Sequence, residues 1–179
     1  MGATRTLLAA ACLGVLGAVP AQAKHDPAKP KEAVAAVSVL SAEDKQHLLN
    51  DQFTVVKIVQ AIPKPVLDRL LGKGPLDGMA DAGQPFQFSD VLRGNLPFRR
   101  LVFAAVSPGY CLIYNEHGGY SPYMEMSLYR LSGGQAPMVW RGRPRGSSFG
   151  SNLSLPQLQS KIREGKYYSM QLPSEAQKP

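Results

Sequence analysis

The chain has 179 residues, 44% of them hydrophobic, and its 20 Lys and Arg against 13 Asp and Glu give a formal net charge of +7. This length fits one domain and excludes a large multidomain assembly. The 17 Gly and 15 Pro are too few for a low-complexity disordered chain. The excess of positive charge is compatible with an anionic partner and identifies none.

The first 23 residues have the pattern of a secretory signal peptide. Arg5 gives a positive start, residues 7–19 are almost entirely apolar, and Ala21-Gln22-Ala23 supplies the small residues of a cleavage site. The apolar stretch is shorter than the roughly 17 to 25 residues of a membrane-spanning helix. We expect cleavage after Ala23, and therefore an exported protein, periplasmic or extracellular. Lipid modification of Cys12 is a competing interpretation that the local spacing disfavours.

Cleavage at that position would remove Cys12 and leave Cys111 as the sole cysteine of the mature chain. No intramolecular disulfide can then form, even in an oxidising compartment. Cys111 stands in an apolar segment, where a cysteine usually behaves as a small buried hydrophobe. We therefore expect a fold held by ordinary packing, with a reactive or intermolecular thiol as the alternative for Cys111.

The start of the mature chain has no apolar periodicity and contains two prolines, so residues 24–40 are predicted to be a flexible leader. The ordered domain is expected to begin at Ser41. The segment Ser41-Ala42-Glu43-Asp44 resembles a capping box, in which the serine side chain accepts from a backbone amide at the start of a helix. This helix is predicted to continue to about Asn50.

The next region carries mixed signals. Residues 53–62 are rich in β-branched residues but follow a helix, and we predict helix followed by strand. Pro65 begins a second short helix. Residues 73–95 are rich in Gly, Asp and Pro and are predicted to form one long loop, with Phe86 and Phe88 anchoring it by alternate burial.

From residue 98 the hydrophobic pattern changes to period two, which predicts strands. Short connections containing Gly indicate hairpins between them. Ser154, with Gln157 three positions later, begins a final helix. The expected fold is a single α+β domain at residues 41–171, followed by a C-terminal tail at 172–179. It is a four-stranded antiparallel meander with helices packed on one face. The four strands are predicted at residues 100–106, 110–116, 123–131 and 137–141.

Two short motifs suggest a hydrolase. The turn at residues 117–119 reads His-Gly-Gly, as in an esterase oxyanion loop, and residues 146–150 match the G-x-S-x-G nucleophile pattern. The nucleophile pattern must connect a buried strand to a helix, whereas residues 146–150 lie in a polar loop. The catalytic order also needs a histidine after the serine, and the last histidine is His117. A lipase or esterase is therefore disfavoured.

Metal and acid–base chemistry have weak support as well. His25, His47 and His117 are far apart in sequence and no mature cysteine pair exists, so we predict no metal site and no cofactor. Glu116 beside His117 could form an acid–base pair. Adjacent residues of a strand point to opposite faces, however, so these two side chains are not expected to converge.

All seven tyrosines and the single tryptophan lie after residue 109. Strand alternation predicts one apolar face, covered by helices, and a second face where tyrosines alternate with carboxylates. A tyrosine combines an apolar ring with a polar hydroxyl, so the second face is a candidate site for a glycan, a peptide or a partner protein. The plainer alternative is that tyrosine fits half-exposed strands by propensity. The candidate residues are Tyr110, Tyr114, Tyr123, Glu125 and Tyr129.

Several arginines cluster in the second half of the sequence. In a cytosolic protein they would suggest nucleic acid. Export excludes that partner and leaves lipid phosphates and envelope polysaccharides, so weak, salt-sensitive binding to an envelope polyanion is one hypothesis for these arginines. The plainer interpretation is a solubilising surface. This basic patch consists of Arg99, Arg100, Arg141, Arg143 and Arg145.

The sequence thus predicts a non-catalytic binding or interaction module of the cell envelope, with no transmembrane segment after cleavage. One alternative is a small hydrolase of an envelope component, with Glu116, His117 and the loop at residues 77–90 as its polar groups. Another is a structural partner of an envelope protein. Convergence of Glu116, His117 and a third polar side chain in one pocket would favour the hydrolase.

Overall fold

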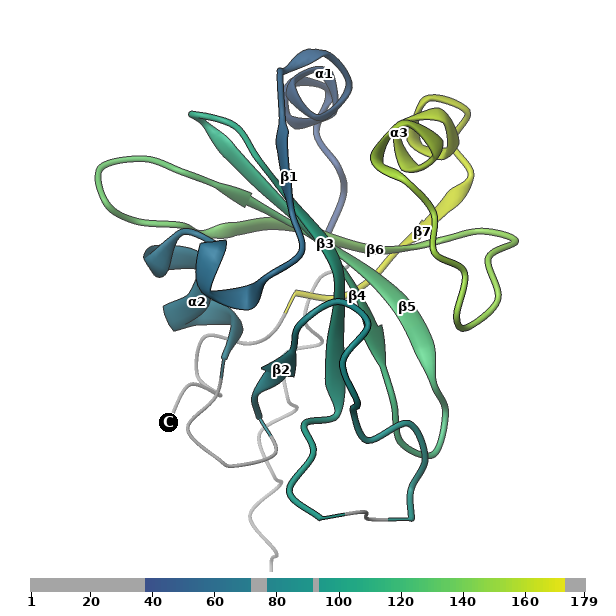
Figure 1. Cartoon of the computed structure of the whole chain (residues 1–179). Coiled ribbons are helices and arrows are strands. Elements are labelled where there is room, and N and C mark those ends of the chain that lie inside the picture. Colours follow the sequence, from purple (N-terminus) through teal and green to yellow (C-terminus); the bar gives the residue numbers. More distant parts are fainter. Residues whose placement is uncertain (1–37, 72–76, 92–93, 173–179) are drawn as a thin grey trace, which may run out of the picture. The chain divides into compact units, whose positions relative to one another are not determined.

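A computed structural model describes residues 38–71, 77–91 and 94–172, which belong to one unit of mixed α+β structure, Val34–Pro179 (Figure 1). The predicted signal peptide, residues 24–37 of the leader and residues 173–179 of the tail lie outside the described residues. In chain order the elements are α1 (Ala42–Asn50), β1 (Thr54–Val56), the 3₁₀ helix η1 (Val59–Ala61), α2 (Lys64–Leu70), β2 (Met79–Ala80), β3 (Arg99–Val106), β4 (Tyr110–His117), β5 (Tyr123–Arg130), β6 (Met138–Pro144), α3 (Leu155–Arg163) and β7 (Tyr167–Ser169).

Within the described residues, seven strands form one sheet in the order β1-β3-β4-β5-β6-β7, with β2 beside β3. Every pair is antiparallel except β2 with β3. The predicted meander is present as β3 to β6, but four strands were too few. The additional strands β1, β2 and β7 are only two or three residues long, which is too short for a period-two pattern to be recognised.

Helices cover both faces of the sheet, so the prediction of helices on one face was wrong. In Figure 1, α1 and α3 lie on one side of the strands and α2 lies on the other. Leu48 of α1 and Leu158 of α3 pack in the same cluster as Leu112, whereas Val66 of α2 packs with Ile113. Residues 110–116 of β4 are buried without interruption. A strand with no exposed face needs cover on both sides.

The N-terminal elements agree with the sequence only in part. Ser41 caps α1 as predicted, because its Oγ accepts from the backbone amide of Asp44 at 3.0 Å. The predicted order of helix then strand at residues 53–62 is wrong, since β1 precedes η1. The β-branched segment Thr54–Val56 pairs with β3. Ser38 is also buried and donates its backbone amide to Met170 O at 3.1 Å, so this residue of the predicted leader is packed against the fold.

The predicted loop at residues 73–95 contains β2 and a buried residue that the sequence did not suggest. Gln87 is 2% exposed, while its neighbour Phe88 is 56% exposed, so the expected anchoring by alternate phenylalanines is wrong. The Gln87 side-chain amide donates to the backbone oxygens of Ser89 and Val91. These two hydrogen bonds pair backbone carbonyl groups of the loop itself, so the buried Gln87 side chain holds the loop's conformation.

The final helix begins as predicted. The side chain of Gln157 accepts from the backbone amide of Ser154 at 2.7 Å, and Gly165 follows the helix with a φ of 69°. Cys111 is a free, fully buried thiol in the described part of the chain, as expected, and burial raises its pKa to about 12. None of the helices among the described residues has the length and apolar character to cross a membrane.

Candidate functional site

The five residues of the predicted tyrosine face lie on two different faces of the sheet. The register pairs Tyr110 with Arg130 and Tyr114 with Met126, so these tyrosines share the face covered by α1 and α3. Tyr123, Glu125 and Tyr129 lie on the opposite face. The single face expected from strand alternation is therefore wrong. Alternation fixes the faces within each strand, but the relation between strands depends on the register set by the connecting turn.

Tyr110 and Tyr114 hold other parts of the fold in place. Both rings are buried. The Tyr110 hydroxyl donates to Asp44 Oδ1 at 3.0 Å, and the Tyr114 hydroxyl donates to Ser151 O at 2.8 Å. Burial raises the pKa of both phenols. These two tyrosines thus attach α1 and the segment before α3 to the sheet.

Glu125 is the centre of a polar cluster on the face opposite α1 and α3. It is 4% exposed. Its Oε2 accepts from the guanidinium of Arg141 at 2.5 Å and lies 3.4 Å from His117 Nε2, while its Oε1 accepts from Ser127 at 3.0 Å. Burial alone would raise the pKa of this carboxyl. The hydrogen bonds and charges of His117 and Arg141 outweigh burial and lower the pKa to about 2.

Tyr123 adds a stacked group to this Glu125 cluster. Its ring lies parallel to the His117 imidazole, with centroids 4.5 Å apart and an interplanar angle of 5°. The Arg143 guanidinium carbon lies 3.5 Å from the centroid of the same ring. Arg143 belongs to β6, which continues to Pro144, beyond the end predicted for this strand at residue 141.

The five arginines of the predicted basic patch do not form one surface. Arg141 and Arg143 lie at the Glu125 cluster. Arg99 donates to Leu70 O at 2.7 Å and so binds the C-terminal end of α2. Arg100 pairs with Glu116 on the face covered by α1 and α3. The Arg145 guanidinium carbon lies 4.3 Å from the ring centroid of Tyr168.

The polar groups of the hydrolase interpretation do not converge. Glu116 and His117 lie on opposite faces, as strand alternation predicts. Ser127 donates to the Glu125 carboxylate, so it does not supply a nucleophile bound to the imidazole. Asp81 accepts from the backbone amide of Val59 at 2.7 Å. Among the residues that the structure describes, no three His, Cys, Asp or Glu side chains are grouped so that they could hold a metal ion.

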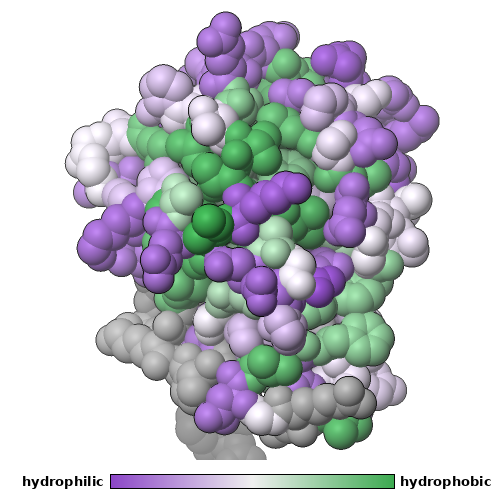
Figure 2. Space-filling model, in the orientation of Figure 1, coloured by the Kyte–Doolittle hydropathy of each residue, from purple (hydrophilic) through white to green (hydrophobic). Residues whose placement is uncertain are grey.

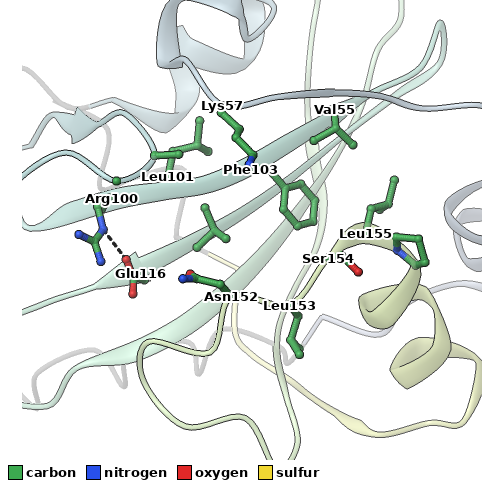
Figure 3. Close-up of a pocket in the computed structure, with 14 residues that line it drawn as sticks. Val55, Lys57, Arg100, Leu101, Phe103, Glu116, Asn152, Leu153, Ser154 and Leu155 are labelled. Atoms are coloured by element: carbon green, nitrogen blue, oxygen red, sulfur yellow. Dashed lines mark hydrogen bonds and ion pairs between the residues drawn. The ribbon is translucent and has the colours of Figure 1, made fainter.

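A pocket of about 720 Å³ opens on the face covered by α1 and α3 (Figure 3). It is lined by β1 and the residue after it, β3, β4, the loop after β2 and residues 152–156, which include the start of α3. Val55, Leu153 and Leu155 are among its aliphatic lining residues. Figure 2 shows hydrophobic residues gathered on the face of the molecule that carries β1 and β3. The sequence did not reveal this pocket, because its walls come from segments far apart in the chain.

Arg100 and Glu116 form an ion pair at this pocket, which we call the β3 pocket. Arg100 Nε donates to Glu116 Oε2 at 2.5 Å, and the guanidinium also lies 4.3 Å from the ring centroid of Phe86. The Glu116 side chain is 1% exposed. Its second oxygen, Oε1, has no hydrogen-bond partner among the described residues. Lys57 lines the pocket from its exposed position after β1.

The geometry therefore defines a mixed α+β protein with a mainly aliphatic pocket on one sheet face and a charged cluster on the other. No family model, curated protein or solved structure matches the chain significantly. Its function is accordingly inferred from its own residues.

Proposed function

We propose that this protein is an exported, non-catalytic binding module of the cell envelope, and that it holds a small amphipathic molecule in the β3 pocket. The observation that carries the proposal is the pocket of about 720 Å³ with aliphatic walls around the Arg100–Glu116 ion pair. Sites for small molecules are commonly concave and mainly apolar, with a few polar groups that orient the ligand.

Binding is favoured over hydrolysis by the positions of the polar side chains. The carboxylate in the pocket, Glu116, is bound to Arg100, and the nearest imidazole in sequence, His117, lies on the other face. A general acid or base must reach the reacting group. The pocket offers attachment points, whereas hydrolysis would need a nucleophile and a base in contact.

Ligand binding at the pocket is tested by a thermal-shift screen of the protein against aliphatic amphiphiles. A ligand that binds only the folded state raises the melting temperature. Val55→Glu places a charge on the pocket wall and should abolish the shift. Ile58→Glu is the matched control, because Ile58 is 57% exposed, similar to the 46% of Val55, and does not line the pocket. Equal shifts in both variants would contradict binding at this site.

Export depends on the signal peptide of residues 1–23. Expression of the full chain in a Gram-negative host, followed by intact mass measurement of the periplasmic fraction, should give a protein that begins at Lys24. Substitution of Ala21 and Ala23 by bulky residues should block cleavage, because the cleavage site needs small side chains. A full-length cytosolic product from the unaltered chain would contradict export.

An anionic envelope surface is a second candidate partner, favoured by the stacked arginines of the C-terminal half. Arg143 stacks on Tyr123 and the exposed Arg145 stacks on Tyr168, so both guanidinium groups are held in place. Binding to anionic vesicles should fall steeply with salt. Arg145→Ala should weaken it more than Arg163→Ala, a control that removes the same charge from an exposed position of α3. Salt-independent binding, or equal effects of the two variants, would count against this partner.

A further inference from the structure

The charges that a molecule in the β3 pocket can contact are positive. Lys57 and Arg100 both line the pocket; Lys57 is exposed, and the Arg100 side chain is 27% exposed. The negative charge of the described lining belongs to Glu116, whose side chain is only 1% exposed. This carboxylate is therefore out of reach of a molecule in the pocket. The two cations outnumber it, so the potential in the pocket favours an anionic group.

Arg100 compensates the buried charge of Glu116. Its Nε donates to Glu116 Oε2 at 2.5 Å, and its guanidinium carbon lies 4.3 Å from the ring centroid of Phe86. A carboxylate paired this closely with a guanidinium group repels a second anion only weakly, because the two opposite charges nearly cancel at a distance. Among the described lining residues, one uncompensated charge then remains, that of Lys57.

Lys57 follows β1 and extends from it on the side of the pocket. Val55 and Lys57 are two residues apart and both line the pocket. Val56, between them, packs against the cluster that contains Val66 of α2, on the opposite face, as strand alternation requires. Figure 3 shows the Lys57 side chain pointing into the pocket, toward Phe103. Lys57 forms no ion pair with the carboxylates that the structure describes, so its ammonium group is available to a ligand.

The uncharged walls determine the rest of the ligand. Val55, Leu153 and Leu155 are aliphatic, and each is at least partly exposed. The aromatic residue of the described lining, Phe103, is 4% exposed, so this wall offers no accessible ring face on which a sugar or a base would stack. The volume of about 720 Å³ lies in the range of small-molecule sites. A saturated chain fits these walls better than a flat ring.

We propose that the β3 pocket binds single-chain aliphatic anions, such as fatty-acid carboxylates, whose head group pairs with Lys57 Nζ while the chain packs on the aliphatic wall. The inference rests on the proposed function, because it names the ligand class of the same pocket. Lys57 determines the sign of the charge that the pocket accepts, and Arg100 keeps the buried Glu116 from opposing it. A cationic head group would be repelled by Lys57.

The test compares two probes with the same eight-carbon chain and opposite charge, octanoate and octylammonium, by calorimetric titration of the folded protein at pH 7 and low salt. We expect octanoate to bind at least about tenfold more tightly, because attraction to Lys57 favours one probe and repulsion disfavours the other. Equal affinities, or tighter binding of octylammonium, would overturn the selection of anions and leave the pocket as a binding site. If neither probe binds, both this inference and aliphatic binding in the pocket are wrong.

Two substitutions of Lys57 test its role. Lys57→Gln should weaken octanoate binding by about fivefold, the upper range for an exposed ion pair, and Lys57→Glu should reverse the preference between the probes. The matched control is Lys64→Gln, which removes a lysine with an 81% exposed side chain from α2, on the opposite face of the sheet. This control should retain the preference for octanoate. An unchanged preference in Lys57→Gln, or an equal loss in Lys64→Gln, would overturn the assignment to Lys57.

Discussion

Glu116 and His117 are adjacent in β4, yet their ion-pair partners lie on opposite faces of the sheet. Glu116 Oε2 lies 2.5 Å from Arg100 Nε, and His117 Nε2 lies 3.4 Å from Glu125 Oε2. The sheet therefore separates the pocket from the Glu125 cluster. Substitutions at Glu125 therefore test the stability of the face that carries the Glu125 cluster, and substitutions at Glu116 test the face that carries the pocket.

The first prediction concerns the pH dependence of stability. Burial raises the pKa of Glu125, but hydrogen bonds and charges from His117 and Arg141 outweigh it and bring the pKa to about 2, below the ordinary value of 4.5. The unfolded chain therefore takes up the proton first, so this stabilisation is present above about pH 4.5 and is lost as the pH falls toward 2. At 1.36 kcal/mol per pKa unit, this shift makes the free energy of unfolding about 3 kcal/mol larger above pH 4.5 than below pH 2.

The measurement is the free energy of unfolding in urea as a function of pH. Between about pH 4.5 and pH 2 the unaltered protein should lose stability more steeply than Glu125→Gln, because the variant has no carboxyl group to titrate there. Glu43→Gln, at an exposed carboxyl, should retain the steep loss. Identical slopes for Glu125→Gln and the unaltered protein would contradict the role of this carboxylate.

The second prediction concerns the attachment of α1 through Asp44. This carboxylate is 4% exposed and accepts from Ser41 at 2.6 Å, from Tyr110 at 3.0 Å and from Arg130 at 2.8 Å. Asp44→Ala leaves the buried Tyr110 hydroxyl without its acceptor, so the free energy of unfolding should fall by about 2 to 4 kcal/mol. Glu43→Ala should cost less than about 0.5 kcal/mol, because this neighbour is exposed and 3.8 Å from Arg130. Similar losses in the two variants would show that Asp44 is not an anchor.

Much of the fold could be predicted from local signals. The strands from β3 to β6 have seven or eight residues, enough for a period-two pattern, and both α1 and α3 carry recognisable caps at Ser41 and Ser154. The short strands β1, β2 and β7 depend on pairing partners far away in sequence. The helices on the second face of the sheet were missed because strand alternation suggested one apolar and one amphipathic face. In the structure β4 is buried from residue 110 to residue 116.

The site could be predicted only in part, for a different physical reason. Strand alternation correctly grouped Tyr123, Glu125 and Tyr129 and separated Glu116 from His117. The position of Tyr114 relative to them depends on the hairpin register, which the sequence did not fix. The β3 pocket depends on tertiary placement, since residues 152–156 must lie against β3 before any wall exists.

The third prediction concerns the reactivity of Cys111. Burial raises the pKa of this thiol to about 12, so only about one molecule in ten thousand carries the reactive thiolate at pH 8. In a Cys12→Ser background, Ellman's reagent should leave the folded protein unmodified and react with one thiol per chain in concentrated guanidinium chloride. Rapid reaction of the folded protein would show that Cys111 is accessible.

The fourth prediction concerns the close packing of Gly142 against Trp140. A Cβ atom at Gly142 would lie 2.3 Å from Trp140 Cζ2 and 2.8 Å from the backbone oxygen of Tyr168. Trp140 is fully buried and donates its indole N–H to Ser169 Oγ at 3.1 Å, so it cannot move aside without losing its packing and this bond. Gly142→Ala should therefore lower the free energy of unfolding by about 3 kcal/mol, as overpacking of a core does.

The control for this prediction is Gly109→Ala. No atom lies within 4 Å of a Cβ at Gly109, and alanine there reduces the conformational freedom of the unfolded chain, so stability should stay within about 1 kcal/mol of the unaltered protein. Urea unfolding, followed by the fluorescence of the single tryptophan, measures both variants. A loss at Gly142 no larger than at Gly109 would mean that β6 and β7 can separate at little cost, and that Trp140 does not fix their spacing.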